Sequence, residues 1–489
     1  MNTSSLFPAF TSLWRAQHSF TLSLLLAFFL CTLKANAQYA TFNMSLLSHW
    51  DDSTVVAEGS SYQIRYSSVW GWADTASGRE YAIIGSTAGT YFIEVTNPTM
   101  PVVRDYVAGR RDSCIWREYK TYQHYAYMVS DDAAPNSFQI FDLQYLPDSV
   151  HVVYDSDSIL IRSHTLYIDG NKLYCNSVKF LVESPKEIVV YSLANPELPL
   201  RISTINDYYP NIAGVHDNFV RNDTMYVSDG YNGYFVYKFN NADSSISMLG
   251  STAPDVNNGY NHSSAITQNG KYAIYTDEVP TGFPVVIADV SDLTNITLVD
   301  TFRTNLGATP HNLEIIGNTR LVLAYYMDGV QIYDISDPHN PVRTGYFDTY
   351  PQNGTLYPDP PKYQGCWGVY TSLPSHVVLA SDMTNGLFVI DGHIALGTGF
   401  DEVIPTNIQV NVWPNPFTTH ISVGVETVKE GAINCKLADV TGRIISEKTT
   451  EFHGGKTEIY IPVPKNTSEG MYILTISTDQ FKRTFKLVK

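Results

Sequence analysis

Short hydrophobic runs separated by polar turns follow one another along most of the chain. The clearest unit has four such runs, at residues 310–316, 321–326, 330–334 and 342–347. A Gly-Asn turn joins the first two runs, which predicts a β-hairpin. Pro338 and Pro341 precede the fourth run, where their fixed φ predicts a turn outside the sheet. The unit is therefore expected to form four antiparallel strands.

This unit recurs along the chain. An aromatic or histidine ring opens each copy, and consecutive rings lie 46 to 56 residues apart, at Trp70, Trp116, His164, His216, His262, His311 and Trp367. Other repeated features are third strands expected at 138–142, 285–289 and 387–391, and glycines with an expected positive φ at Gly89, Gly233, Gly329 and Gly386. A four-stranded repeat of this length is typical of a propeller blade, whereas a β-sandwich with coincidental spacing is the alternative. The sequence predicts an all-β fold, with a seven-bladed β-propeller over residues 38–395.

The last copy has only three strands of its own before the chain leaves it near residue 391. A sheet without its outer strand would leave an open edge, which β proteins usually cover. Residues 43–50 precede the first copy and have no other obvious partner. We expect them to close the ring as the fourth strand of the seventh blade.

The N-terminal segment is typical of a secretory signal. Arg15 precedes an apolar run from Phe20 to Leu33, and small residues lead to Ala37, which predicts a signal peptide over residues 1–37 with cleavage after Ala37. A membrane anchor is the alternative, but the run is shorter than the roughly 20 residues needed to span a bilayer. The mature chain is expected to be exported and to have no transmembrane segment.

The C-terminal segment has a different pattern of hydrophobic and polar residues. After a linker at 396–408, residues 409–489 contain short alternating strands that predict a small β-sandwich. The segment resembles the C-terminal sorting domains of the type IX secretion system in its motifs Pro414-Asn415-Pro416, Asp439-Val440-Thr441-Gly442-Arg443 and Gly470-Met471-Tyr472. This resemblance implies the type IX machinery as a partner, passage across the outer membrane, and an extracellular or surface-attached location. An ordinary accessory sandwich is the alternative.

The net negative charge of the chain bears on which partners it can bind. The chain carries a net charge of −17; residues 1–37 and 405–489 each carry +2, so residues 38–404 carry −21. Such a surface repels phosphate backbones, and therefore nucleic acid is not an expected partner. The four cysteines beyond the signal, Cys114, Cys175, Cys366 and Cys435, do not have metal-ligand spacing and are expected to be free and buried.

The histidines supply the main candidate chemistry. Blade-opening residues lie near the propeller axis on one face, so His164, His216, His262 and His311 should meet at one mouth of the channel. Imidazoles bind zinc, manganese or iron, and Asp217, Asp277 and Glu278 could orient them from a second shell. These residues form a candidate divalent-metal site. Histidines that only hydrogen-bond to channel water are the alternative.

Other residues could contact a ligand at the same mouth. Trp70, Trp116 and Trp367 open the three remaining blades, and aromatic rings could stack on a sugar or a peptide side chain. Asp229 and Asp382 end second strands and are expected nearby. An extracellular glycan, peptide or protein is therefore a possible ligand class, and channel filling by the tryptophans is the alternative.

No nucleophile elbow, HExxH motif, phosphate loop or dinucleotide fingerprint occurs in the sequence. No catalytic residue is therefore predicted. The leading hypothesis is an exported, surface-attached binding protein, with a metal-dependent hydrolase or lyase using the same rim as the alternative.

The repeats also resemble those of the choice-of-anchor B family, which is built on LVIVD-type repeats and occurs on bacterial surfaces. The matching stretches include Trp70-Gly71-Trp72, Trp116-Arg117-Glu118-Tyr119, Val215-His216-Asp217, Thr276-Asp277-Glu278 and His311-Asn312-Leu313. Thr165 after His164 and Pro310 before His311 depart from the family pattern. The resemblance implies a propeller and a surface anchor, and it implies no activity.

Overall fold

The computed structural model describes residues 39–59, 62–132, 138–252, 259–305, 307–351, 363–397, 409–439, 443–477 and 482–489. Residues 1–37, including the predicted cleavage site at Ala37, lie outside this range, as does most of the predicted linker at 396–408. The regular secondary structure of the described residues is almost entirely β-strand, as predicted. Two single-turn helices, η1 (Ile205–Asp207) and α2 (His393–Leu396), are the helical elements among them.

Seven sheets of four or five antiparallel strands form from the described part of residues 39–397. Their innermost strands are β3 (Tyr66–Asp74), β7 (Arg117–Tyr122), β11 (Leu166–Asp169), β15 (Asp217–Arg221), β19 (Tyr260–Ile266), β23 (Leu313–Ile316) and β27 (Cys366–Tyr370). Their second strands are β4 (Arg79–Ser86), β8 (Tyr125–Ser130), β12 (Lys172–Val178), β16 (Thr224–Ser228), β20 (Tyr272–Val279), β24 (Arg320–Ala324) and β28 (Val378–Asp382).

The third strands are β5 (Gly89–Glu94), β9 (Phe138–Asp142), β13 (Lys186–Ser192), β17 (Tyr234–Phe239), β21 (Val285–Asp289), β25 (Val330–Asp334) and β29 (Gly386–Asp391). The outer strands are β6 (Val102–Ala108), β10 (His151–Ser156), β14 (Leu200–Thr204), β18 (Ile246–Ser251), β22 (Thr297–Phe302), β26 (Val342–Phe347) and β2 (Ser45–Trp50). The sheets are numbered one to seven here in the order of their innermost strands.

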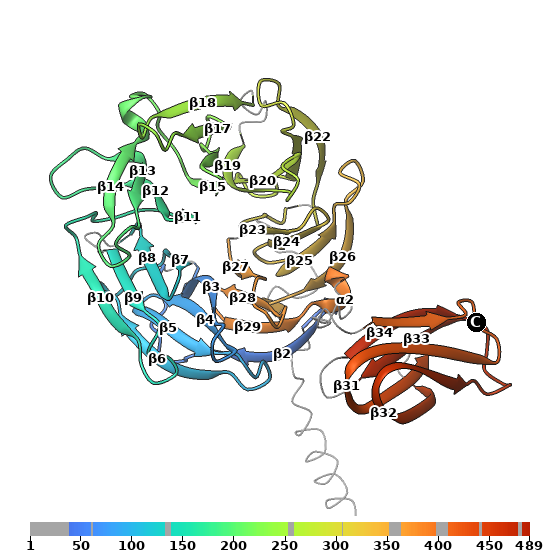
Figure 1. The fold of residues 1–489 in the computed structure, drawn as a ribbon. Helices are drawn as coiled ribbons and strands as arrows, with labels where there is room; N and C mark the ends of the chain where they lie inside the picture. The colour runs from blue at the N-terminus through green and yellow to red at the C-terminus, as the bar shows by residue number, and fades with distance from the viewer. Residues whose placement is uncertain are drawn as a thin grey trace, which may run out of the picture.

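The sheets stand around a common centre (Figure 1). Each innermost strand contacts the innermost strand of the next sheet, and β27 of the seventh sheet contacts β3 of the first. A separate hydrophobic cluster fills each gap between neighbouring sheets; in the gap between the seventh and first sheets, Leu387 and Val389 pack with Ala82 and Ile84. This arrangement is consistent with a β-propeller and excludes the β-sandwich alternative for this region.

The predicted closing strand is confirmed. β2 pairs with β29 through His49 and Phe388, and so supplies the outer strand of the seventh sheet (Figure 1). β1 (Thr41–Phe42), just before it, adds a fifth strand to the sixth sheet by pairing with β26. The N-terminal end of the described chain therefore covers the edges of two sheets.

The glycine prediction is correct at three positions and wrong at one. Gly233, Gly329 and Gly386 have positive φ, at 103°, 69° and 90°. Gly89 is not among the positive-φ residues; instead, a Cβ there would lie 2.3 Å from the carbonyl oxygen of Val107. Close approach of a neighbouring backbone, and not a left-handed turn, explains glycine at this position.

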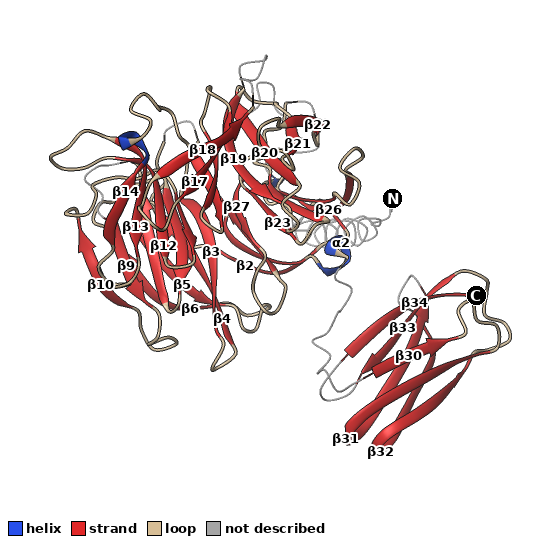
Figure 2. Ribbon diagram, turned by 45° about the horizontal axis from the view of Figure 1, so that its top comes forward, coloured by secondary structure: helices blue, strands red, loops and turns tan. Residues whose placement is uncertain are grey.

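The C-terminal segment forms one hydrogen-bonded sheet of β30 (Gln409–Trp413), β31 (His420–Asp439), β32 (Ile444–Pro462), β33 (Met471–Ser477) and β34 (Lys482–Val488). The long strands β31 and β32 pair along their length (Figure 2). The first half of β31 also pairs with β30, and its second half pairs with β33. Residues of both halves, such as Ile421 and Leu437, share one buried cluster. A sandwich of two separate sheets stays a prediction.

All four described cysteines are buried thiols, as expected: Cys114, Cys175, Cys366 and Cys435.

Candidate functional site

The structure brings the four predicted histidines together. Each lies at the entrance to the innermost strand of its sheet, and the rings follow one another in chain order. The ring centroids are 4.1 Å apart for His164 and His216, 4.0 Å for His216 and His262, and 4.4 Å for His262 and His311. Imidazoles separated by about 50 residues in sequence are therefore neighbours in space.

Two of the three predicted tryptophans extend this row. The Trp367 ring lies 4.1 Å from His311, and Trp116 stacks on Trp367 with a centroid distance of 4.6 Å and an interplanar angle of 17°. His164, His216, His262, His311, Trp367 and Trp116 are together called the mouth ring below. It takes one side chain from each of six consecutive sheets.

Trp70 lies elsewhere, which corrects the predicted register of the first sheet. The residue beside Arg117 is Ser67, whose Oγ accepts a hydrogen bond from the Arg117 N–H at 3.2 Å. Trp70 lies further along β3, where its Nε1–H donates to Thr121 Oγ1 at 3.1 Å. β3 begins four residues before Trp70 and has an irregular register between Tyr66 and Val69. Alignment on the aromatic residue alone could not show this offset.

The mouth-ring histidines are oriented by oxygen atoms at Nδ1. His216 Nδ1 lies 2.8 Å from the carbonyl oxygen of His262, and His311 Nδ1 lies 2.5 Å from that of Trp367. A carbonyl oxygen can only accept, so both Nδ1 atoms carry the proton. The Nε2 atoms of neutral His216 and His311 are therefore lone-pair donors.

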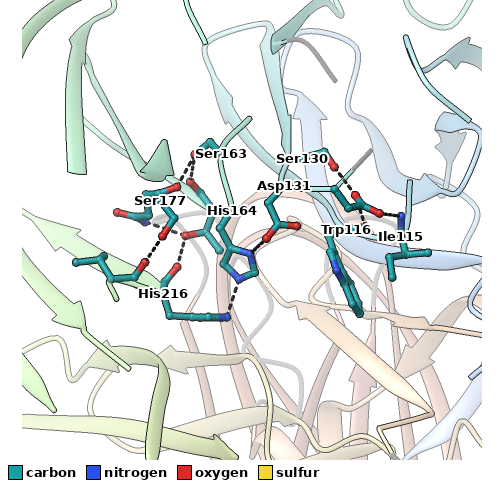
Figure 3. Close-up of polar contacts among 12 residues, drawn as sticks. Ile115, Trp116, Ser130, Asp131, Ser163, His164, Ser177 and His216 are labelled. Carbon is teal, nitrogen blue, oxygen red and sulfur yellow. Dashed lines mark hydrogen bonds and ion pairs between the residues drawn. The ribbon is translucent and has the colours of Figure 1, made fainter. Parts of the chain in front are cut away.

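His164 carries a different charge. Its Nδ1 lies 2.6 Å from Asp131 Oδ2, and its Nε2 lies 2.6 Å from His216 Nε2 (Figure 3). Since His216 Nε2 has no proton, His164 must donate at both nitrogens when no metal ion is present. Burial opposes the positive charge, but the hydrogen bond and the negative charge of Asp131 outweigh it and raise the pKa of His164.

The other three imidazoles are neutral. Burial, and then the charge of His164, hold the pKa of His216 well below its usual value. Burial and the neighbouring His216 also hold the pKa of His262 well below its usual value, and burial lowers the pKa of His311 to about 3. Neutral imidazole is the form that binds metal ions.

Three ligand atoms could hold one metal ion. One atom each from His216, His262 and Glu278 lie within 4.8 Å of one another. His262 Nε2 is 3.6 Å from Glu278 Oε2, and the hydroxyl of Tyr326 donates to Glu278 Oε1 at 2.5 Å. Burial raises the pKa of Glu278. A carboxylate beside imidazole nitrogens is a donor set that suits zinc, and also manganese or iron.

The other predicted carboxylates do not join this group. Asp217 follows His216 but lines the central cavity, where its charge acts on His164. Asp277 Oδ1 accepts a hydrogen bond from Asn261 Nδ2 at 3.4 Å. Asp382 is buried in its own turn, where it accepts hydrogen bonds from the backbone of Thr384 and Asn385. Asp229 is also buried, and burial raises its pKa to about 7.

Sequence reasoning missed Asp131, although a signal for it exists. Ser130-Asp131 ends the second strand of its sheet in the way that Ser228-Asp229 and Ser381-Asp382 do. A search of that repeat position would have found it. Tyr326, Glu118, Lys120 and Glu314 have no comparable signal, because their importance depends on contacts between sheets.

A cavity of about 430 Å³ lies at the centre, lined by the innermost strands of all seven sheets. Its lining includes the residue that follows five of the mouth-ring members in sequence: Thr165, Asp217, Ser263, Asn312 and Gly368. The mouth ring therefore lies at one end of this cavity. Trp70, Glu118, Lys120 and Glu314 line the cavity as well.

Residues 411–489 match the family described as the secretion system C-terminal sorting domain. No curated protein sequence matches the chain. No helix among the described residues is both long and apolar enough to cross a membrane.

Several solved structures are similar to this chain at low identity. PorZ, an essential surface component of the type IX secretion system of Porphyromonas gingivalis, is 11% identical with a TM-score of 0.46, over 84% of this chain and 58% of PorZ. The periplasmic gluconolactonase PpgL of Pseudomonas aeruginosa is 10% identical, with a TM-score of 0.46 over 82% and 99% of the two chains. The β-propeller domain of Cps50 (Swd1) from Myceliophteria thermophila is 8% identical, with a TM-score of 0.45 over 71% and 98%.

This chain thus spans 58% of the length of PorZ. The sorting domain implies interaction with the type IX secretion machinery, and it indicates export across the outer membrane to the cell surface or the extracellular space.

Proposed function

We propose that the protein is a surface-attached binding protein whose seven sheets are the blades of one propeller, of the choice-of-anchor B type with LVIVD repeats. The support is the closed series of contacts between innermost strands, together with the sorting domain at residues 411–489. In this proposal residues 1–37 are a signal peptide, and the C-terminal domain only directs export. The propeller carries the binding function.

The export proposal is tested by deletion of residues 409–489. In a host with the type IX system, the truncated protein should stay in the periplasm, whereas the full chain should reach the surface or the medium. Cell fractionation and protease accessibility on intact cells measure the difference. Equal surface amounts of both proteins would contradict the proposal.

We further propose that the mouth ring binds one divalent metal ion. His216, His262 and Glu278 are the ligands, with His164 as a fourth after it loses its proton. The observation that carries this proposal is that one ligand atom each of His216, His262 and Glu278 lie within 4.8 Å of one another. In the metal-free structure the 2.6 Å between His164 Nε2 and His216 Nε2 is a hydrogen-bond distance, and the proton between them must leave before both nitrogens can bind one ion. The Nδ1 contacts of His164 and His216 are those that orient histidine ligands in metal sites.

Zinc is the preferred ion, because four nitrogen and oxygen ligands suit its tetrahedral geometry. The protein should be purified without added metal, dialysed, and examined by elemental analysis and competitive zinc titration. One equivalent of metal is expected for the wild type. His216→Ala and His262→Ala should each weaken affinity by roughly 100-fold.

His339→Ala is the matched control, because this histidine lies in an exposed turn. It should leave zinc affinity unchanged. A wild-type protein that binds no zinc, manganese or iron would contradict the metal proposal. Wild-type metal affinity in His262→Ala would contradict it as well.

The ligand of the propeller is proposed to be an extracellular glycan, peptide or protein that contacts the Trp116–Trp367 stack. Trp116 is half-buried, whereas Trp367 is buried. Glycan and peptide arrays should therefore show binding that Trp116→Ala reduces. Trp367→Ala would also disturb packing and is a weaker test.

A hydrolase or lyase is the second candidate. It is favoured by the His164–Asp131 pair, because an imidazole oriented by a carboxylate can act as an acid or a base. A panel of glycans, esters and lactones should be tested with zinc supplied. Turnover that His216→Ala abolishes would support the enzyme, and no turnover would favour the binding protein.

A further inference from the structure

The central cavity carries an excess of negative charge. Glu118, Asp217 and Glu314 line it from the second, fourth and sixth sheets, and Lys120 is the one basic residue among the described residues of its lining. With all four groups ionised, the cavity has two uncompensated negative charges. The surrounding chain is acidic as well, so the field favours entry of a cation.

Lys120 does not neutralise these carboxylates by direct contact. Its Nζ lies 3.9 Å from the centre of the Trp70 ring and donates to the carbonyl oxygen of Tyr119 at 3.2 Å. The ion pairs among the described residues do not include one between Lys120 and a carboxylate. Lys120 shows instead that an ammonium group is stable in this cavity against an aromatic face.

The carboxylates are held in place by neutral donors. Glu314 Oε2 accepts from the backbone N–H of Thr371 at 2.8 Å and from its hydroxyl at 2.6 Å. Burial raises the pKa of Glu118 and of Glu314, and the charge of Lys120 only partly offsets it. These groups are thus positioned, and the described residues do not supply a contacting counterion for them.

The size and walls of the cavity indicate an organic molecule. About 430 Å³ is within the usual range of ligand pockets and is far larger than one ion with a few waters. Aromatic side chains line the cavity beside the carboxylates: Trp70, Tyr167, Phe219 and Tyr370. Such walls favour an alkyl chain that carries ammonium groups over a strongly hydrated metal ion.

We infer that the central cavity is a binding site for a small aliphatic diamine, whose two ammonium groups pair with the carboxylates of Glu118, Asp217 and Glu314. This site takes different residues from the mouth-ring metal site, although the charges of Glu118 and Asp217 also act on His164. The two charges of the diamine match the excess charge of the cavity.

The test uses the protein without residues 1–37, with EDTA present so that the mouth ring is metal-free. Isothermal titration calorimetry with 1,4-diaminobutane should show saturable binding with one site. Glu314→Gln keeps the shape of the side chain but removes a charge, and should weaken binding about tenfold. Glu183→Gln, at an exposed carboxylate that pairs with Arg201, should leave binding unchanged.

Lys120→Met gives a result that a folding defect could not produce. It removes the internal ammonium group and should strengthen diamine binding several-fold, because a competing positive charge is lost. Absence of saturable binding by the wild type would overturn the inference. So would an unchanged affinity in Glu314→Gln, weaker binding in Lys120→Met, or saturation by calcium or magnesium chloride in place of the diamine.

Discussion

At the scale of single residues, the position of protons decides what the mouth ring can bind. Carbonyl oxygens of the neighbouring strands fix the protons of His216 and His311 on Nδ1. Asp131 is the residue that makes His164 different, because it adds a charged acceptor. The mouth ring therefore has three neutral imidazoles and one that is charged.

Asp131→Asn tests this role. The carboxylate of Asp131 orients His164 and raises its pKa, and the substitution removes this charge. Zinc affinity should therefore fall by roughly 10- to 100-fold. The His164 pKa, measured by NMR on metal-free protein, should fall as well. Asp292→Asn, in an exposed turn, is the control. An unchanged His164 pKa in Asp131→Asn would refute the assignment.

Asp229 links stability to pH. Burial raises its pKa to about 7 from an ordinary value of 3.8. The folded protein therefore binds a proton that the unfolded chain has lost between about pH 4 and pH 7, so this group destabilises the fold as the pH rises through that window.

Asp229→Asn should remove this effect. The variant should be more stable than the wild type at pH 8, by on the order of 1–3 kcal/mol, and equally stable near pH 4. Thermal unfolding at both pH values measures the difference. A variant that is less stable at pH 8 would show that the carboxylate makes a favourable contact in its ionised form.

At the scale of elements, the turns between second and third strands set the shape of each sheet. Gly329 and Gly386 combine positive φ with a close neighbouring backbone. A side chain at Gly329 would place its Cβ 2.1 Å from the carbonyl oxygen of Phe347, at the end of the outer strand. These turns therefore need glycine for two separate reasons.

The variants Gly329→Ala and Gly78→Ala separate the cost of a positive φ from the cost of a close neighbouring backbone. Both glycines have φ near 70°, but a Cβ at Gly78 would have no atom within 4 Å. Gly78→Ala should cost about 1 kcal/mol from backbone strain alone, whereas Gly329→Ala should cost about 3 kcal/mol or more. Chemical denaturation of the two variants measures the difference, and equal losses would contradict the role of Phe347.

At the scale of the whole molecule, the ring is closed by a strand from the far end of the sequence. β2 covers β29, and Leu47 and Trp50 pack against the cluster between the seventh and first sheets. The contacts that close a ring stabilise every sheet, because an open seam would expose two sheet faces and a strand edge.

Deletion of residues 38–50 should therefore lower Tm by roughly 10 °C or more and promote aggregation. Deletion of 38–42 is the control. It removes only β1, which adds a fifth strand to a sheet that already has four, and should lower Tm by a few degrees at most. Similar Tm values for the two deletions would show that β2 does not close the ring.

The repeat itself could be predicted from the sequence. Period-two hydrophobic patterns and proline-spaced turns depend on local physics, so the third strands at 138–142 and 285–289 and the closing strand near 43–50 match the structure. The repeated spacing of the blade-opening rings also predicted that four distant histidines would be neighbours. The offset of Trp70 arose because a one-dimensional pattern contains no information on strand register between sheets.

The sequence by itself determined the all-β fold, the order of the strands and the identity of the histidines. Only the tertiary structure decided which oxygen fixes each imidazole proton, that Glu278 and not Asp217 lies beside His262, and that Glu118, Lys120 and Glu314 meet in one cavity. The reason is physical. Strand patterns depend on residues a few positions apart, whereas proton positions and charge pairs depend on atoms within a few ångströms that come from different sheets.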